Sequence, residues 1–569
     1  MECLDSRRLT GPSLIMDGAG AVIDMLVGHG HGDSDREAFI DEWQRQLKTM
    51  LAAVGWAGEQ SYVYRHADGV SLAISAPIDG LYAATDINDW AWQAARAVVD
   101  EGAAPAAPAV PAVEEAAAGF RESIAEEQNP ALRELYAQAH RRRLPCLVDD
   151  EFLSIGLGSG SQTWPVDELP SPAEIDWPSL HTIPVALVTG TNGKTTSVRM
   201  AAAMVRAAGR VVGICSTDWI AVDDAIVDRG DYSGPGGART VLRDRRVDIA
   251  ILETARGGLL RRGLAVEHAD AALITNIAED HLGEFALHDL AALADLKWVL
   301  TKALDAGGCL VLNADDALLV ERSRASAAPI TWFSTGSDNA RLREHLAAGG
   351  DSFGVEDGEI VHRSGSRRQP LLPVADIPMT LGGAATHNVA NALGAAGLAA
   401  GLGLPLDAIA TGLRNTRRED HPGRLNVFEF DGVKAIVDFA HNPHGMQALF
   451  DLGGNLDAKR RLLLIGQAGD RSDQSISDLA DAAWAMQPDR IIIKEMGRYA
   501  RGRASGEVAE ILRRRFLQLG APQRILTYQE HELDAVREAV EWSRRGDVLI
   551  LLIHEDVDGI TAFLNSRCS

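Results

Sequence analysis

The chain has 569 residues, of which 46% are hydrophobic and 24% are charged, and its formal net charge is −25. This length allows about three or four domains with separate cores, and the composition excludes a disordered or fibrous chain. The acidic balance opposes contact with a nucleic-acid backbone, so we expect no nucleic-acid partner.

Cysteine usage and the N-terminus indicate the compartment. The five cysteines form no C-x-x-C pair, which is typical of reduced thiols and gives no metal cage. The first residues, MECLDSRRL, lack the basic and apolar segments of a secretion signal, and no apolar run reaches the ~18 residues of a membrane span. We therefore expect a cytoplasmic protein without a membrane partner.

The N-terminal part combines helical and alternating patterns. A helix is predicted over Arg36–Val54 and a strand over Val70–Ala76, which indicates an α+β unit. The Ala/Pro-rich passage Glu101–Gly119 interrupts the periodicity and predicts a flexible or extended connector. A second helix, Pro130–Arg143, and a short strand, Leu144–Val148, follow it.

A linker and two series of alternating strands and helices define the rest of the chain. Gly, Ser and Pro residues between Gly156 and His181 indicate a linker, because a folded domain needs at least ~50 residues. From Ile183, short apolar runs separated by helices predict a parallel, doubly wound sheet with functional residues at the carboxyl ends of its strands. A second α/β series, Rossmann-like, begins near Leu425. The predicted units are an N-terminal α+β domain (1–165), a linker (166–182), a central domain (183–424) and a C-terminal α/β domain (425–569).

The stretch TGTNGKTTS, from Thr189 to Ser197, follows an apolar strand and opens a helix. It resembles a phosphate-binding loop but is shorter, because the usual G-x-x-x-x-G spacing would need glycine where Val188 stands. The alternative is a Gly/Asn turn at a helix start with a solvated lysine. The combination of strand, loop, lysine and threonine favours nucleotide binding.

The residue types in this loop suit phosphate. Gly190 and Gly193 allow a tight backbone turn that directs N–H groups at the β- and γ-phosphates, and the helix N-terminus adds favourable electrostatics. Lys194 would reach the same phosphates, and Thr195 would offer its hydroxyl to Mg²⁺.

Polar residues also follow two further strands of the central series. Glu253 ends an apolar strand and is the candidate Mg²⁺ ligand, because this cation prefers oxygen ligands; an ordinary strand-end carboxylate is the alternative. Asn276 and His281 follow the next strand, at the corresponding edge of the sheet. Taken alone, a single histidine there is more often structural than metal-binding.

A lysine lies on the apolar face of the helix predicted over Asp289–Leu304. At ~100° per residue, Lys297 falls in the middle of a stripe of leucines, whereas Lys302 lies ~140° around the helix on a solvated face. Snorkelling along the apolar surface would explain Lys297 without a function. The functional alternative is a lysine that faces a catalytic cleft.

These signals occur together, in the same order, in the Mur-type ATP-dependent amide ligases, which the chain resembles. The shared motifs are GTNGKTT, a strand-end glutamate, N-I-x-x-D-H-L, a helical lysine at the cleft, THNVANALGAA (Thr386–Ala396), GRL (Gly423–Leu425) and DFAHNP (Asp438–Pro443). Within that family, other stretches resemble the cyanophycin synthetases, whose Mur-type half adds arginine to the β-carboxyl of aspartate. They are ETARGGLLRRGL, AEDHLG, GDRSD (Gly469–Asp473), RYARGRASGE and RRLTGPSLI (Arg7–Ile15).

One part of that pattern is missing. Cyanophycin synthetases carry an ATP-grasp domain between their N-terminal domain and their Mur-type half, and Ala139–Gln162 resembles the entry to it. Mur-like sequence then begins almost at once, so the engine that extends the polymer backbone is absent from this chain. We expect one amide-forming site.

The resemblance implies roles for individual residues. Lys297 would be the lysine that many members carry as a carbamate, an anion that helps to bind a second Mg²⁺, and Asn388 would contact adenine. The residues implied in ATP binding are Gly190, Thr191, Asn192, Gly193, Lys194, Thr195, Thr196, Asn388, Arg424, Asp438 and His441. Those implied in catalysis are Lys194, Lys297, His281 and Asn276, and those implied in Mg²⁺ binding are Thr195, Glu253 and His281.

The implied function is an ATP-dependent amide ligase that activates a carboxylate as an acyl phosphate and couples it to an amino-acid amine. The implied substrates are amino acids or short peptides, with an arginine-like amine and an aspartate-like carboxylate. Whether the chain forms a homodimer is left open. One alternative is a noncatalytic partner that binds nucleotide or polymer and assembles with a complete synthetase. A phosphate-loop ATPase or kinase is another, and the short loop and the DFAHNP hinge weigh against it.

Overall fold

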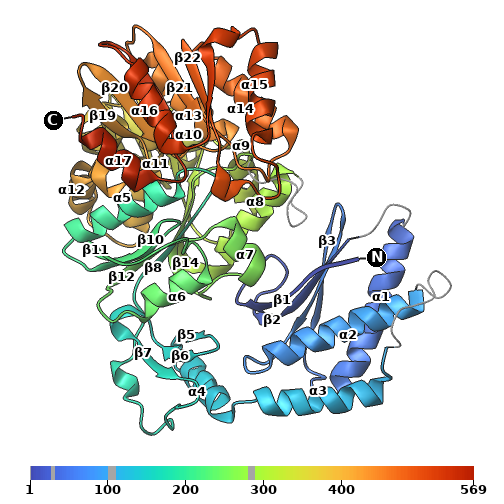
Figure 1. Cartoon of the computed structure of the whole chain (residues 1–569). Helices are drawn as coiled ribbons and strands as arrows, with labels where there is room; N and C mark the ends of the chain where they lie inside the picture. The colour runs from blue at the N-terminus through green and yellow to red at the C-terminus, as the bar shows by residue number, and fades with distance from the viewer. Residues whose placement is uncertain (1, 27–31, 100–109, 280–288, 337, 569) are drawn as a thin grey trace.

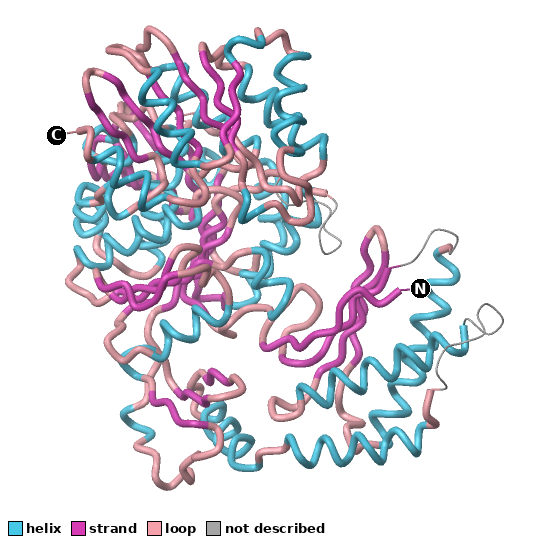
Figure 2. Tube along the Cα trace, viewed as in Figure 1, coloured by secondary structure: helices cyan, strands magenta, loops and turns pink. Residues whose placement is uncertain are grey.

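The computed structural model describes residues 2–26, 32–99, 110–279, 289–336 and 338–568. Figure 1 shows three regions: an N-terminal sheet with its helices to one side, a central sheet, and a C-terminal α/β unit stacked on the central one. Figure 2 shows helices packed around the sheets of the central and C-terminal units. No described helix has the length and apolar character needed to cross a membrane.

The N-terminal unit is an antiparallel sheet covered by two long helices. Its strand order is β1-β2-β4-β3, formed by β1 (Glu2–Thr10), β2 (Ala19–Leu26), β3 (Ser61–His66) and β4 (Gly69–Ser75). The helices are α1 (Asp33–Ala53) and α2 (Leu81–Val99). Buried Trp43 of α1 donates its indole N–H to Asn88 of α2 over 3.0 Å, which joins the two helices inside the core. The predicted α+β pattern is confirmed here.

The predicted Ala/Pro connector is wrong over its second half. Part of Glu101–Gly119 lies outside the described residues, but helix α3 begins at Val113 and runs to Glu127. Between Pro111 and Pro130 the sequence holds no proline and is rich in Ala and Glu, which are strong helix formers. Ala117 and Ile124 then bury against the N-terminal core, and this packing stabilises the helix.

The predicted linker is also partly wrong, because much of it is packed. A small antiparallel sheet is formed by β5 (Cys146–Val148), β6 (Phe152–Ile155) and β7 (Gln162–Pro165), next to helix α4 (Pro130–Arg141). Ile175 and Leu180, from the predicted linker, are buried in the core of this small unit. Short strands without strict alternation of polar and apolar residues are not detected from periodicity. The residue limits of the four predicted units stay predictions.

The central unit is a doubly wound sheet, as predicted. Among the described residues its strand order is β11-β10-β9-β12-β8-β13-β14-β15-β16-β17-β18. The parallel strands are β8 (Val185–Thr189), β9 (Val212–Cys215), β12 (Ile249–Glu253), β13 (Ala269–Ile274), β14 (Leu304–Asn313), β15 (Ile330–Ser334) and β16 (Asp351–Glu356). Antiparallel strands extend both edges: β10 (Trp219–Val222), β11 (Ala225–Arg229), β17 (Glu359–Ser364) and β18 (Arg367–Pro373).

Helices cover both faces of this sheet. Along β8, Leu187 belongs to one core whereas Ala186 and Val188 belong to the other, which is the alternation of a strand buried on both sides. One face carries α5 (Lys194–Ala207), α11 (Thr386–Gly401) and α12 (Leu406–Asn415). The other carries α6 (Pro235–Arg243), α7 (Arg256–Arg262), α8 (Leu290–Trp298), α9 (Ala317–Arg322) and α10 (Ala340–Ala347).

The helix predicted over Asp289–Leu304 is shorter than expected. Helix α8 ends at Trp298, a 3₁₀ turn covers Val299–Ala303, and Leu304 is already the first residue of β14. Leu304 pairs with Ala269 of β13, and this strand pairing ends the helix early. Lys302 lies in the 3₁₀ turn and pairs with Asp17 of the N-terminal unit at 2.8 Å.

The C-terminal unit is a second, mostly parallel sheet with helices on both faces, as predicted. Its strand order is β19-β20-β24-β21-β22-β23, and β19 alone of the described strands runs antiparallel to its neighbour. The strands are β19 (Asn426–Phe430), β20 (Val433–Asp438), β21 (Arg461–Ile465), β22 (Arg490–Lys494), β23 (Leu526–Gln529) and β24 (Val548–Leu552). One face holds α13 (Pro443–Asn455), α14 (Asp473–Trp484) and α15 (Glu507–Gln518), and the other holds α16 (Glu532–Trp542) and α17 (Val557–Asn565).

Helices α12 and α5 approach closely at Gly412, which gives a test of the central core. A Cβ atom on Gly412 would lie 2.4 Å from the Cα atom of Met204, so we expect Gly412→Ala to lower the free energy of unfolding by about 1–3 kcal/mol. Gly119 of α3 is exposed and has open space around it, so Gly119→Ala should raise that free energy by about 1 kcal/mol. Urea unfolding followed by tryptophan fluorescence compares the two; equal effects would contradict the tight helix contact.

Candidate active site

The carboxyl ends of the parallel strands in the central and C-terminal sheets face a shared cavity of about 330 Å³. The central unit lines it with the loop after β8, with Glu253 at the end of β12 and with Lys297 of α8. The C-terminal unit contributes residues that follow β20, β21, β22 and β24: Phe439, His441, Gln467, Arg471, Arg501 and His554. Ligands in open α/β sheets bind at such strand ends.

The loop after β8 requires glycine at two positions. Gly190 has φ of 145° and Gly193 has φ of 87°, in the region that favours glycine. A Cβ atom on Gly190 would lie 1.8 Å from the hydroxyl of Thr275, and one on Gly193 would lie 2.0 Å from the amide oxygen of Asn391. The loop backbone therefore lies directly against β13 and α11.

Asn276 braces this loop. Its side-chain oxygen accepts a hydrogen bond from the backbone N–H of Asn192 at 3.0 Å, and its amide group donates to the Asn192 carbonyl at 3.0 Å. Lys194 folds back over the loop and donates to the carbonyls of Gly190 at 3.2 Å and Thr191 at 3.0 Å. The lysine is therefore held at the loop, where the sequence predicts phosphate binding.

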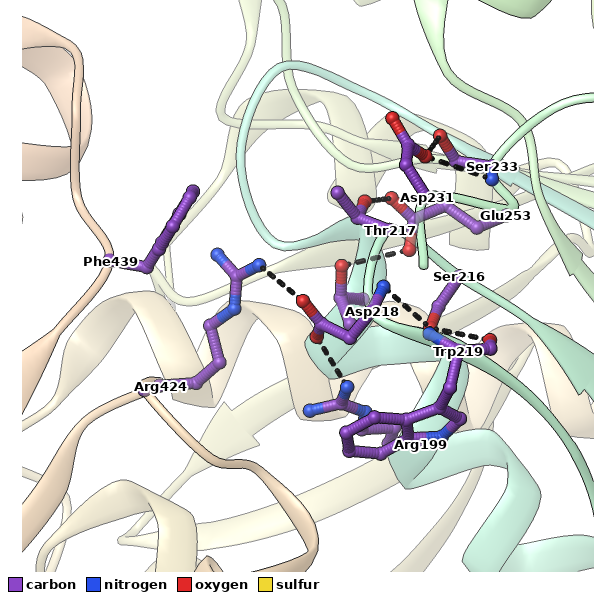
Figure 3. A network of polar contacts seen from close by, with 12 residues as sticks. Arg199, Ser216, Thr217, Asp218, Trp219, Asp231, Ser233, Glu253, Arg424 and Phe439 are labelled. Atoms are coloured by element: carbon purple, nitrogen blue, oxygen red, sulfur yellow. Dashed lines mark hydrogen bonds and ion pairs between the residues drawn. The ribbon is translucent and has the colours of Figure 1, made fainter. Parts of the chain in front are cut away.

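Glu253 lines the cavity and is almost fully buried, with 1% exposure. Its carboxylate accepts a hydrogen bond from the hydroxyl of Thr217 at 2.7 Å (Figure 3). It accepts a second one from the hydroxyl of Thr195 at 2.8 Å. A buried carboxylate beside a threonine hydroxyl supplies the hard oxygen ligands that fit Mg²⁺, which also keeps waters and binds substrate phosphates. His281 lies outside the described residues, and within the described ranges no group of three acidic, His or Cys side chains surrounds a metal position.

Lys297 is 4% exposed and lines the cavity. Its ammonium group donates to the carbonyl of Gly190 over 2.8 Å, so it reaches the loop from the helix α8 side. The structure thus places its charged end at the loop, where snorkelling to solvent would not bring it. Its carbamylation stays a prediction.

A second cavity, of about 600 Å³, adjoins the first on the other side of the loop. Asn192, Gly193 and Thr196 line both cavities, and so do Arg424 and His441. Asn388 lines the second one, but its amide donates to the Met379 carbonyl at 2.8 Å and its oxygen accepts from Asn391 at 3.0 Å. Asn388 therefore helps to shape this cavity as well as to line it.

Asp438 stabilises the turn that connects the two units. Its carboxylate accepts hydrogen bonds from the backbone N–H groups of Leu425 and Ala440, both at 2.8 Å. His441 approaches the carbonyl of Phe439 with its Nδ1 atom, and its own carbonyl accepts from Gln467. These residues hold the hinge segment in place at the mouth of both cavities.

An amide pair that the sequence did not indicate joins the loop to the C-terminal unit. The Asn192 amide donates to the Asn442 oxygen at 3.2 Å, and the Asn442 amide donates to the Asn192 oxygen at 3.0 Å. Asn442 also caps helix α13, where it accepts from the N–H of Gly445. An Asn-Pro pair before a helix is a capping signal that could have singled this residue out.

Asp218 was also missed, because the segment after β9 carries no known motif. Its carboxylate lies between two arginines, Arg199 of α5 and Arg424 of the connecting turn, with Arg424 at 3.8 Å (Figure 3). The Arg424 guanidinium also lies over the ring of Phe439 at 4.6 Å. Thr217 and Asp218 are consecutive, so one short turn contacts both the buried Glu253 and Arg424 of the connecting turn.

Two buried histidines are held neutral near this turn. His421 is fully buried close to Arg199 and Arg424, and burial lowers the pKa of His421 well below its usual value. Burial likewise lowers the pKa of His554, whose Nδ1 atom faces the ammonium group of Lys494 at 3.1 Å. Because an ammonium only donates, Nδ1 of His554 accepts, and its Nε2–H donates to the carbonyl of Ala440.

A glycine loop that starts a helix at the edge of a doubly wound sheet, faced by a second α/β sheet, is the arrangement of a nucleotide-binding pair of domains. Residues 188–399 match the Mur ligase middle domain, and residues 423–552 match the Mur ligase, glutamate ligase domain. The chain belongs to the Mur ligase family, whose members are ATP-dependent, ADP-forming amide ligases.

Two individual relatives agree with this assignment. Cyanophycin synthetase from Synechocystis sp. is 37% identical over 68% of this chain, which spans only 44% of that protein. UDP-N-acetylmuramoylalanine–D-glutamate ligase from Chromobacterium violaceum is 32% identical over 64% of this chain and 68% of its own length. A bifunctional folylpolyglutamate synthase/dihydrofolate synthase structure from Yersinia pestis CO92 covers 67% of this chain and 89% of its own, with 18% identity and a TM-score of 0.47.

The close packing around Gly193 makes a prediction for nucleotide binding. In Gly193→Ala, the positive φ and the contact with Asn391 introduce strain of about 1–3 kcal/mol in the loop, so we expect ATP affinity to fall at least about tenfold. Gly236 lies in the first turn of α6 with open space around it and outside both cavities, so Gly236→Ala is the matched control. Calorimetric titration with ATP measures both; unchanged affinity in Gly193→Ala would mean that nucleotide does not contact this loop.

The buried neutral His421 predicts acid sensitivity. Its pKa in the folded protein is lower than in the unfolded chain, so the unfolded state binds an extra proton once the pH falls below about 6.5. This histidine should then reduce the free energy of unfolding by up to about 1.4 kcal/mol per pH unit. We expect His421→Leu to show a shallower loss of stability between about pH 6.5 and 5. Parallel curves for the two proteins in urea unfolding would rule this contribution out.

Proposed function

We propose that the chain is an ATP-dependent ligase that joins a carboxylate to an amino-acid amine through an acyl phosphate. The observation that carries the proposal is one cavity with the phosphate loop, Glu253 and Lys297 on one wall and charged residues of a second sheet on the other. A protein that only binds nucleotide has no need for a second, oppositely placed charged wall. The proposed cofactor and co-substrate are Mg²⁺ and ATP.

The first proposed step is attack of a substrate carboxylate on the γ-phosphate, which forms an acyl phosphate and releases ADP. The transferred group is strongly anionic, so catalysis depends on positioning and on positive charge. Lys194 over the loop and Arg424 at the hinge supply that charge from opposite sides of the cavity. Bound Mg²⁺, held by Glu253 and Thr195, would add charge stabilisation.

The second proposed step is attack of an amine on the acyl phosphate, with release of phosphate. The cavity lining also carries both charge signs: Asp231 and Asp470 are acidic, whereas Arg471 and Arg501 are basic, and Arg501 pairs with Asp470 at 3.3 Å. Such a lining suits a zwitterionic amino acid, whose carboxylate and amine need opposite partners. The Asn192–Asn442 pair keeps the two units in contact, which helps to exclude water from the reactive acyl phosphate.

The proposed substrates are an arginine-like amine and an aspartate-like carboxylate, on the basis of the similarity to cyanophycin synthetase. A short peptide with a free side-chain or terminal carboxylate would fit the same chemistry. Since the chain spans less than half of that relative, the substrate pair is a proposal from the shared part alone.

The test incubates the full chain with ATP, Mg²⁺ and pools of amino acids and short peptides, and measures ADP release and new masses. We expect a condensed product, and we expect Lys194→Ala to lower its rate about 10²-fold or more because a charge at the phosphates is lost. Lys302→Ala is the control, since Lys302 lies outside the cavity and pairs with Asp17.

Binding of ATP without any product across the pools would contradict the proposal. That outcome would favour the noncatalytic alternative, a partner that assembles with a complete synthetase. Equal loss of rate in Lys194→Ala and Lys302→Ala would show that the variants act through folding.

A further inference from the structure

A third cavity, of about 510 Å³, lies where the N-terminal sheet and the small β5–β7 unit meet the central unit. Its walls come from the end of β1, from β5, from helix α6 and from the segment between α7 and β13. None of its lining residues lines either of the two cavities at the active site. It is therefore a separate space of the size that small-molecule sites have.

The walls of this cavity are firmly joined. The backbone N–H of Leu264 donates to the Pro12 carbonyl at 2.7 Å, and Arg262 donates to the Arg8 carbonyl at 3.0 Å. A Cβ atom on Gly11 would lie 2.2 Å from the Leu264 carbonyl oxygen, so these two segments of the chain are in contact there. Residues of the N-terminal unit and the central unit thus form one continuous wall of this cavity.

Arg239 of α6 lies in this cavity and lacks an acidic partner. One of its terminal nitrogens donates to the hydroxyl of Thr10 at 2.8 Å, while its Nε atom is buried without a hydrogen bond among the described residues. In that same part of the chain no carboxylate lies within ion-pair distance of Arg239. Burial lowers the pKa of Arg239, in keeping with a cation that is short of compensation.

The two carboxylates that act most strongly on Arg239, Asp149 and Asp150, already pair with other arginines, and no ion pair joins Arg239 to Glu267 or Asp305, the described carboxylates in the cavity lining. Asp149 pairs with Arg243 at 2.5 Å, and Asp150 pairs with Arg8 at 2.7 Å. Arg239 is half-buried, with its Nε atom fully buried. A cation that loses water on burial is costly unless it is paired, and an arginine is not expected to lose its proton. The missing partner is therefore expected to come from outside the chain.

The rest of the lining indicates what such a partner carries. Leu144, Pro145, Leu264 and Val266 give the cavity an apolar wall, and Glu267 and His268 lie at its exposed rim. A carboxylate would meet Arg239, an apolar side chain would lie along the wall, and an amine would find the Glu267 carboxylate. Guanidinium and carboxylate groups match in geometry, which makes their hydrogen bonds strong.

We propose that this cavity is a second binding site, distinct from the active site, for the free α-carboxylate of an apolar amino acid or of a short peptide. Arg239 binds the carboxylate at the base of the cavity. The site depends on the N-terminal unit, because Thr10 and Pro12 form part of its wall.

Calorimetric titration of the full chain without ATP tests this site with two matched pairs of probes. L-leucine against L-leucinamide tests a free amino acid, and trialanine against trialaninamide tests a peptide terminus. We expect at least one acid to bind about tenfold or more tightly than its amide, because the amide lacks the charge that meets Arg239. The stronger pair identifies the source of the carboxylate; no preference for either acid would overturn the proposal.

Variants locate the binding. We expect Arg239→Gln to abolish the preference for the acid and Arg239→Lys to retain part of it. Thr10→Val removes the hydrogen bond to Arg239 but keeps the guanidinium, so it should bind nearly as the wild type does. If Thr10→Val loses binding as fully as Arg239→Gln, loosening of the wall explains both and the proposal fails.

Two readouts separate this site from the active site. Lys194→Ala should bind the acid with unchanged affinity. The second-site proposal would therefore stand even if the ligase proposal failed. Loss of binding in Lys194→Ala would instead assign the probe to the active site. The acid should also slow iodoacetamide labelling of Cys146, which lines the cavity, and not that of exposed Cys3. Peptide mass spectrometry follows both cysteines, and equal rates with and without the acid would exclude binding in this cavity.

Discussion

At Gly190 and at Gly193 the backbone has no room for a side chain, because Thr275 at the end of β13 and Asn391 of α11 lie against it. The same few residues meet Asn276 at the next strand end, Lys297 from α8 and Asn442 from the C-terminal unit. A small displacement of this loop would therefore disturb contacts with four elements at once. Tight packing transmits such displacements, since interiors leave few voids to absorb them.

Charge around this loop is arranged in buried or half-buried pairs. Glu253 accepts hydrogen bonds from two threonines, and Asp218 lies between Arg199 and Arg424. Although the chain carries a net charge of −25, the phosphate loop is approached by cationic groups from both units. Local composition at the strand ends, and not the overall charge, thus sets the field that a nucleotide would meet.

The N-terminal unit contacts the central unit through the end of β1 and helix α7. Helices α6 and α7 both begin next to Ser233 and Ala255, whose backbones are hydrogen-bonded at the active-site cavity, and both run towards the third cavity. The wall of one cavity is thus covalently continuous with the wall of the other. This arrangement gives the N-terminal unit a position from which it can contact ligand without reaching the phosphate loop.

Much of the fold could be predicted from the sequence, and the failures have a common cause. The doubly wound central sheet and the C-terminal α/β unit follow from short apolar runs, whose local periodicity survives in the structure. The helical start of α3 and the packed segment around Ile175 were missed, because their stability comes from distant core residues. The early end of α8 was missed for the same reason, since strand pairing at Leu304 overrides helix propensity.

The sequence by itself determined the glycine loop after β8, the strand-end Glu253 and the apolar setting of Lys297, because each is defined by residues close together in the chain. Only the tertiary structure decided that Thr217, Asp218 and Asn442 belong to the same site, and that Arg239 lies beside Thr10. These contacts join residues far apart in the sequence, and no local pattern encodes which strand ends or domain faces meet. Their geometry arises when two sheets and an N-terminal unit bury their apolar faces together.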